Sequence, residues 1–240
     1  DHPISEGQRL AGLDSEVTAS WRLLFKIMDA EGIGCEQTVI ADMPPGRMPG
    51  IGGMIEDRDP VGSGALSMYL LRAIGDKGAL FSFERREDFA EIAQANVTTE
   101  MGVRPSNWTV TLGDLQEQLP TTVEPHSIDR VVLDMLAPWE CVAKAAEVLR
   151  PGGVFLAYVA TTTQLSATAE ALKEDGHFTE PESSETIVRG WHHEGLAVRP
   201  QQRMIGHTGF LIQSRRMAPG VEVLARRRRP AKGAYGVPEE

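Results

Sequence analysis

The sequence has 240 residues, 41% hydrophobic and 24% charged, which is enough for one sizeable domain or for one domain with a small appendage. It contains no run of about 18 apolar residues, so a membrane span is not expected, and the opening DHPISEGQRL lacks the basic and apolar segments of a secretory signal. The net charge of −10 argues against a surface coated with phosphate-binding residues, although Arg226 to Arg229 and Lys232 form a local basic cluster that fits either RNA contact or a solvated tail.

The first 60 residues predict a helix followed by an irregular loop. Apolar residues recur at helical spacing after the candidate caps Asp14 and Ser15, at Val17, Trp21, Leu24 and Met28. A strand-like run from Gln37 to Ala41 leads into MPPGRMPGIGGM, whose prolines and glycines hold no long regular element. We therefore treat residues 1–60 as a separate N-terminal segment.

From Gly62 onward, helices and strands alternate. Helical patterns follow VGSG and cover RREDFAEIAQANVTTEMG, WECVAKAAEVL and QLSATAEALKED; strand patterns cover ALFSFE, WTVTLGD, IDRVVLDM and GGVFLAYVAT. Two later strands, around 185–191 and 209–214, are close enough to pair antiparallel. Such alternation predicts an α/β fold with right-handed crossovers and a mainly parallel sheet covered on both faces. We assign this domain to residues 61–217 and expect residues 218–240 to be a basic, disordered tail.

Three successive predicted strands end in an acid: Glu84, Asp114 and Asp134. A single acid at a strand end is usually a helix cap or a turn residue. Three in succession after a glycine-containing loop favour a ligand site, because ligands of open α/β sheets bind beyond the carboxyl ends of the strands.

The loop Gly62-Ser63-Gly64 and the acid Glu84, 20 residues after Gly64, predict a nucleoside site. A dinucleotide site would prefer a third glycine where Ser67 stands. A hydride-transferring oxidoreductase is therefore a weaker interpretation. S-adenosyl-L-methionine (SAM) carries a sulfonium cation and no phosphate, so it suits an acid-rich pocket better.

The segment LDMLAPWE, residues 133–140, places Asp134 before a proline-containing loop and Trp139. Methyl transfer to a ring nitrogen needs the acceptor base held in line with the methyl group. A carboxylate can accept a hydrogen bond from the exocyclic amine and stabilise the positive charge that develops on the base. Trp139 could pack against that base, or simply against the third helix.

Together with VGSGALS, LRPGG, YVATTTQL, LAVRPQ and GHTGFL, this segment resembles the tRNA (adenine-58-N1)-methyltransferase family, and most of all its actinobacterial members. The resemblance spans about Gly62 to Met217. It implies a class I methyltransferase fold with a seven-stranded sheet and an antiparallel final strand, SAM as the methyl donor, adenosine in the T-loop of tRNA as the acceptor, and a homotetramer.

The resemblance also implies residue roles. Ser63, Gly64, Ala65 and Leu66 would contact the methionine part of SAM, Glu84 its ribose and Asp114 its adenine end. Gly62 would also bind the cofactor, and Phe89 would lie against it. Asp134 would be the catalytic carboxylate between cofactor and base. The acceptor side would be lined by Trp139, Gln164, His207 and Thr208.

One departure from the family pattern motivates an alternative. Anchored on Gly62 and Gly64, the glycine motif puts Arg58 where the family has an acid and Pro60 where it has its first glycine, and the charged IEDRDP takes the place of an apolar first strand. Proline fixes φ and removes an N–H, which changes the path of the turn. The alternative is a non-catalytic tRNA-binding or scaffold subunit that keeps the fold but has lost SAM.

The cysteine content predicts a cytoplasmic protein. Cys35 and Cys141 lack the paired spacing of metal ligands, and no metal site is expected. Two scattered cysteines suit a reducing compartment better than a disulfide framework.

Overall fold

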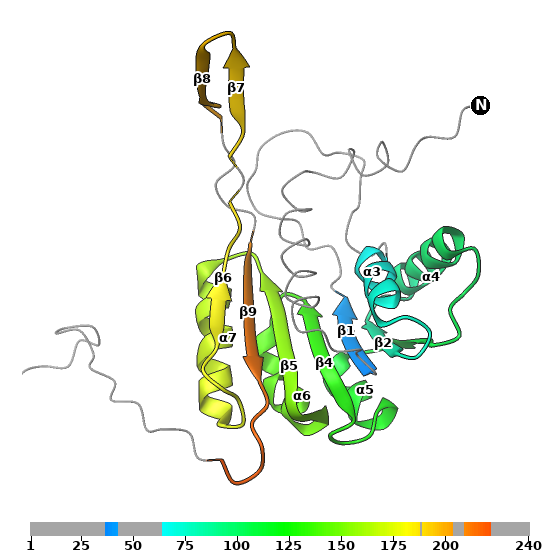
Figure 1. Cartoon of the computed structure of the whole chain (residues 1–240). Coiled ribbons are helices and arrows are strands. Elements are labelled where there is room, and N and C mark those ends of the chain that lie inside the picture. The colour runs from blue at the N-terminus through cyan, green and yellow to red at the C-terminus, as the bar shows by residue number, and fades with distance from the viewer. Residues whose placement is uncertain (1–36, 43–63, 188, 204–208, 222–240) are drawn as a thin grey trace, which may run out of the picture.

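The computed structural model describes residues 37–42, 64–187, 189–203 and 209–221. Within these residues the main sheet has seven strands in the order β3-β2-β1-β4-β5-β9-β6, as Figure 1 shows. The strands are β1 (Gln37–Asp42), β2 (Ala79–Glu84), β3 (Trp108–Leu112), β4 (Ile128–Asp134), β5 (Leu149–Val159), β6 (Glu182–Ser184) and β9 (Phe210–Arg215). Strands β1 to β5 pair in parallel, and β9 runs antiparallel to both β5 and β6. The predicted α/β class with an antiparallel final strand is confirmed.

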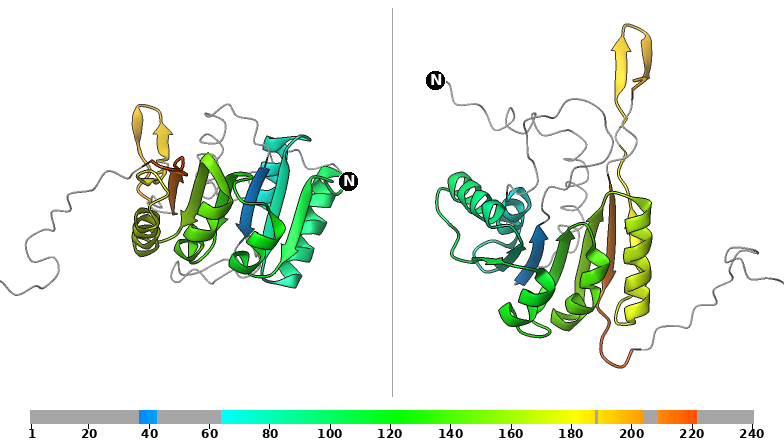
Figure 2. Two further views of the ribbon diagram at one scale, coloured as in Figure 1. Left: turned by 90° about the horizontal axis from the view of Figure 1, so that it is seen from below. Right: turned by 180° about the vertical axis from the view of Figure 1, so that it is seen from behind.

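Helices cover both faces of this sheet (Figure 2). They are α3 (Ala65–Ile74), α4 (Glu87–Met101), α5 (Leu115–Thr122), the 3-10 helix η1 (Pro138–Cys141), α6 (Val142–Val148) and α7 (Thr162–Asp175). Alternate residues of one strand enter different cores: in β5, Phe155 packs with α5, α6 and α7, whereas Leu156 packs with α3. This alternation is the period-two signature of a strand buried on both faces.

Strand β1 lies at the centre of the sheet, parallel to β2 on one side and β4 on the other. It confirms the predicted strand at Gln37–Ala41, but it lies on the N-terminal side of the boundary predicted at residue 60. The domain therefore includes residue 37 and does not start at residue 61. The first-strand position, which the glycine motif assigned to the charged IEDRDP, is held by β1. The physical reason is composition, since TVIA suits a buried parallel strand and IEDRDP, with its charges and its proline, does not.

One predicted strand needs correction, and one helix was not predicted. The strand that pairs antiparallel with β9 is Glu182–Ser184, not residues 185–191. Trp191 instead begins β7 (Trp191–Glu194), which pairs only with β8 (Ala197–Pro200) among the described strands and projects from the sheet as a hairpin (Figure 1). Helix α5 was missed because it is short and contains Pro120.

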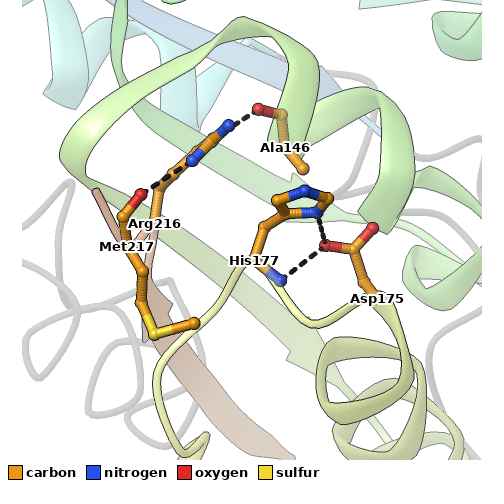
Figure 3. Close-up of polar contacts among 5 residues, drawn as sticks. All are labelled: Ala146, Asp175, His177, Arg216 and Met217. Carbon is orange, nitrogen blue, oxygen red and sulfur yellow. Dashed lines mark hydrogen bonds and ion pairs between the residues drawn. The ribbon is translucent and has the colours of Figure 1, made fainter. Parts of the chain in front are cut away.

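Arg216 anchors the chain at the end of the sheet where the parallel strands begin (Figure 3). Its Nε donates to the carbonyl of Ala146 at 2.6 Å and its Nη1 to the carbonyl of Met217 at 2.7 Å. The N–H of Met217 in turn donates to the carbonyl of His177 at 2.7 Å, and the His177 ring lies 2.9 Å from Asp175 Oδ1. These contacts tie the segment after β9 to α6 and to the end of α7. They lie at the end of the sheet opposite the carboxyl ends of the parallel strands.

In the described part of the chain, no helix is both long enough and apolar enough to cross a membrane.

Candidate functional site

Three acidic residues lie side by side where the central strands end. Asp42, the last residue of β1, pairs in register with Asp134, the last residue of β4. On the other side of β1, Ala41 pairs with Phe83, so Glu84 is the residue next to Asp42 at the end of β2. We call Glu84, Asp42 and Asp134 the acidic edge. Glu84 and Asp134 were predicted at this edge from the sequence, whereas Asp42 was not.

Glu84 is almost fully buried, with 5% of its surface exposed. Its Oε1 accepts a hydrogen bond from the backbone N–H of Arg86 at 2.9 Å. Burial raises the pKa of the Glu84 carboxyl above its usual value, and the backbone N–H groups of Arg86 and Arg85 partly offset this. The carboxylate is thus held in a fixed orientation by the turn that follows β2.

Asp114 lies one strand further out and caps α5. Its Oδ1 accepts from the backbone N–H of Gln116 at 2.9 Å, as an N-cap residue does. Its Oδ2 lies 3.6 Å from Nε of Arg85, which follows β2. This acid therefore has the structural role that a single strand-end acid usually has, and its predicted contact with the adenine end of a cofactor stays a prediction.

Phe89 lies in the first turn of α4 and is buried. The guanidinium of Arg86 stacks over its ring, 3.9 Å from the centroid. Arg86 thus contacts both ends of the turn between Glu84 and Phe89, through its backbone N–H and its guanidinium.

Gly64 begins α3 with a φ of 74°, in the left-handed region that favours glycine. A Cβ on Gly64 would lie 3.0 Å from the backbone oxygen of Ala93 in α4. Close packing of α3 on α4 is thus a structural reason for this glycine. Leu66 is buried in the core beneath α3, Ala65 is half-buried, and Gly62 and Ser63 lie outside the described residues.

Asp134 is half-buried, and burial raises the pKa of its carboxyl from 3.8 to about 6. Tyr158 of β5 is its neighbour in register. Burial, and to a smaller extent the charge of Asp134, raises the pKa of the Tyr158 phenol to about 12. A tyrosine with a raised pKa therefore stands beside a carboxyl group whose pKa is about 6.

The loop after Asp134 leads into η1, where Trp139 is half-buried. Gln164, in the first turn of α7, reaches back to this loop and donates from Nε2 to the carbonyl of Leu136 at 2.9 Å. Trp139 and Gln164 thus both lie next to the Asp134 loop. His207 and Thr208 fall outside the described residues.

Comparison with known proteins places this arrangement in context. Residues 54–195 match the family described as "tRNA methyltransferase complex GCD14 subunit". The chain is 30% identical over 178 residues to the tRNA (adenine(57)-N(1)/adenine(58)-N(1))-methyltransferase TrmI of Methanocaldococcus jannaschii, covering 64% of this chain and 61% of that protein. It is 34% identical over 155 residues to the tRNA (adenine(58)-N(1))-methyltransferase TrmI of Thermus thermophilus, covering 65% of this chain and 58% of that protein.

The chain therefore spans about three fifths of the length of the curated relatives that it matches. Among solved structures, a SAM-dependent O-methyltransferase from Thermotoga maritima superposes with a TM-score of 0.62 at 28% identity, covering 82% of this chain and 66% of that one. The fold is that of the class I methyltransferases.

Proposed function

Because the chain belongs to the GCD14 family of tRNA methyltransferase subunits, we propose that it methylates N1 of the adenosine at position 58, in the T-loop of tRNA, with SAM as the methyl donor. The names of the M. jannaschii and T. thermophilus relatives support this acceptor and this ring position. The acidic edge is the observation that carries the proposal, because three neighbouring strands end in acidic residues where a class I fold binds its ligands.

The chemistry of the acidic edge fits SAM. SAM supplies an activated methyl group on a sulfonium cation, and neighbouring carboxylates stabilise a cation in a partly buried site. Glu84, whose Oε1 accepts from the Arg86 N–H, is proposed to accept hydrogen bonds from the ribose hydroxyls. Gly64 has no side chain that could cap α3, so the first N–H groups of this helix are suited to the cofactor's carboxylate. Asp114 is proposed to contact its adenine end, and Phe89 to lie against the cofactor.

Asp134 is proposed to act on the acceptor base. Transfer of the methyl group to N1 places a positive charge on the adenine ring, and its exocyclic amine becomes a stronger donor. The Asp134 carboxylate, once deprotonated, accepts a hydrogen bond from that amine and stabilises the charge as it forms. Trp139, His207 and Thr208 are proposed to line the same side of the site, with Trp139 against the base.

The test is methyl transfer by the purified chain to an unmodified tRNA transcript. We expect one 1-methyladenosine per tRNA, detected by mass spectrometry and by a primer-extension stop at position 58. A transcript with guanosine at position 58 should accept none. An Asp134→Asn variant should bind SAM but lose at least about 100-fold in kcat, since removing one group that stabilises transition-state charge typically costs this much. SAM binding without methylation of any tRNA would contradict the proposal.

The alternative is a non-catalytic tRNA-binding subunit. It was motivated by the altered first-glycine loop with Arg58 and Pro60, which lies outside the described residues. The methyltransferase names of the M. jannaschii and T. thermophilus relatives favour the catalytic function over it. Calorimetry distinguishes the two functions, since a scaffold subunit would bind tRNA without SAM. The predicted homotetramer is checked by light scattering on the same sample.

A further inference from the structure

The side-chain amide of Gln164 connects the ends of two neighbouring strands. On one side, its Oε1 accepts from the backbone N–H groups of Ala160 and Thr161, at 3.2 and 3.1 Å, and from the Thr161 hydroxyl at 3.1 Å. On the other side, its Nε2 donates to the carbonyl of Leu136 at 2.9 Å. Ala160 directly follows β5, and Leu136 comes two residues after the end of β4.

Only one orientation of this amide satisfies its partners. Backbone N–H groups can only donate and the Leu136 carbonyl can only accept, so a flipped amide would break bonds on both sides. The oxygen already accepts three hydrogen bonds. Gln164 is also the third residue of a capping box in which the Thr161 hydroxyl accepts from its backbone N–H at 3.2 Å. One side chain therefore connects the start of α7 to the loop that follows Asp134.

This bridge joins the chain just after β4 to the chain just after β5. Asp134 and Tyr158 are partners in register on β4 and β5, and the bridge lies just beyond both. Met135, between Asp134 and Leu136, is held from the other side by a contact of 3.7 Å between its sulfur and that of Cys141. Leu136 itself is 66% exposed, so packing of its own side chain does little to fix the loop. The Gln164 bond thus holds the loop at Leu136, where the side chain is exposed.

We infer that Gln164 is a positioning residue that fixes the Asp134 loop through the carbonyl of Leu136, and not a residue that binds the acceptor base. The inference rests on the proposed function of Asp134. A carboxylate that must meet a base amine at hydrogen-bond distance is sensitive to its loop, since a misplacement of about 1 Å can cost roughly 100-fold in rate.

Gln164→Glu separates the bridge from the helix cap. A glutamate at this position keeps the acceptor of the capping box but replaces the Nε2 donor by an oxygen that faces the Leu136 carbonyl. We expect a melting temperature within a few degrees of the original protein, a kcat lowered about 10- to 100-fold, and an unchanged KM for tRNA. The pH at which kcat is half-maximal should also shift, because the surroundings of Asp134 change.

Thr161→Ala is the matched control. It removes the capping hydroxyl, and with it one of the three hydrogen bonds to Gln164 Oε1, but leaves the Gln164 bond to Leu136 in place. It should therefore lower the melting temperature while kcat is retained. If Gln164→Glu instead raises the KM for tRNA and leaves kcat and its pH profile unchanged, Gln164 binds the acceptor and the inference is wrong.

Amide hydrogen exchange of residues 135–137 keeps this test independent of the proposed function. Exchange should be faster in Gln164→Glu than in both the original protein and Thr161→Ala. An inactive original protein would contradict the proposed function and leave this comparison intact. Equal exchange in all three proteins would overturn the inference.

Discussion

The phenol ring of Tyr158 fills the space that a side chain at residue 209 would need. A Cβ on Gly209 would lie 2.3 Å from both Cζ and Oη of the ring. Gly209 immediately precedes β9, whose first residue Phe210 pairs with Val159, next to Tyr158. The Tyr158 ring, next to Asp134, therefore has its space because the residue before β9 has no side chain.

Gly209→Ala should displace the Tyr158 ring, because non-bonded carbon and oxygen atoms cannot lie 2.3 Å apart, and the ring must then leave its place against the core. We expect a loss of about 1–3 kcal/mol in the free energy of unfolding, as for other overpacking substitutions. Urea denaturation measures it. In a Tyr158→Leu background the same substitution should cost much less, and an equal cost in both backgrounds would show that the clash with the ring is not the cause.

Asp134→Asn should stabilise the ligand-free protein at high pH. The folded-state pKa of Asp134, about 6, lies above its ordinary value of 3.8, so the folded state holds a proton that the unfolded state releases between these values. Stability from this group is fully present below pH 3.8 and is lost as pH rises through 6. At about 1.4 kcal/mol per pKa unit, the loss is roughly 3 kcal/mol.

Asparagine has no charge to bury, so Asp134→Asn should exceed the original protein in stability at pH 8 by roughly 1–3 kcal/mol and match it near pH 4. Urea melts at both pH values provide the measurement. If the two proteins have the same stability difference at both pH values, the burial cost of the carboxylate is wrong.

Glu84→Gln should weaken SAM binding without disturbing the fold. Glutamine keeps an oxygen that can accept from the Arg86 N–H, but it loses the charge that strengthens hydrogen bonds to the ribose hydroxyls. We expect about a tenfold increase in the dissociation constant, measured by calorimetry. Glu100→Gln is the matched control, since Glu100 is exposed and pairs with Arg72, away from the acidic edge. Equal losses in the two variants would point to overall charge as the cause.

The sequence predicts the strand-end acids but not which of them lie together. Glu84, Asp114 and Asp134 end successive predicted strands, yet β3 lies outside β2, and β4 lies next to β1. Strand order is set by crossovers between distant segments, so chain order alone selects Asp114, a helix cap, and misses Asp42.

Gln164 shows the opposite case. Its spacing from Thr161 is that of a capping box, a local signal present in the sequence. Its bond to Leu136, 28 residues earlier, depends on β4 and β5 being neighbours and could not be derived from spacing.

A pair of proline substitutions tests the central strand directly. Ile40 lies inside β1, in register with Ser82 of β2 and Val132 of β4. Proline there removes an N–H from a ladder that is paired on both sides, which a central strand does not tolerate. We expect Ile40→Pro to abolish cooperative unfolding in a thermal melt followed by circular dichroism. Ile55→Pro, in the segment that the glycine motif would assign to the first strand, should melt like the original protein. The reverse pattern would restore IEDRDP to the centre of the sheet and remove Asp42 from the acidic edge.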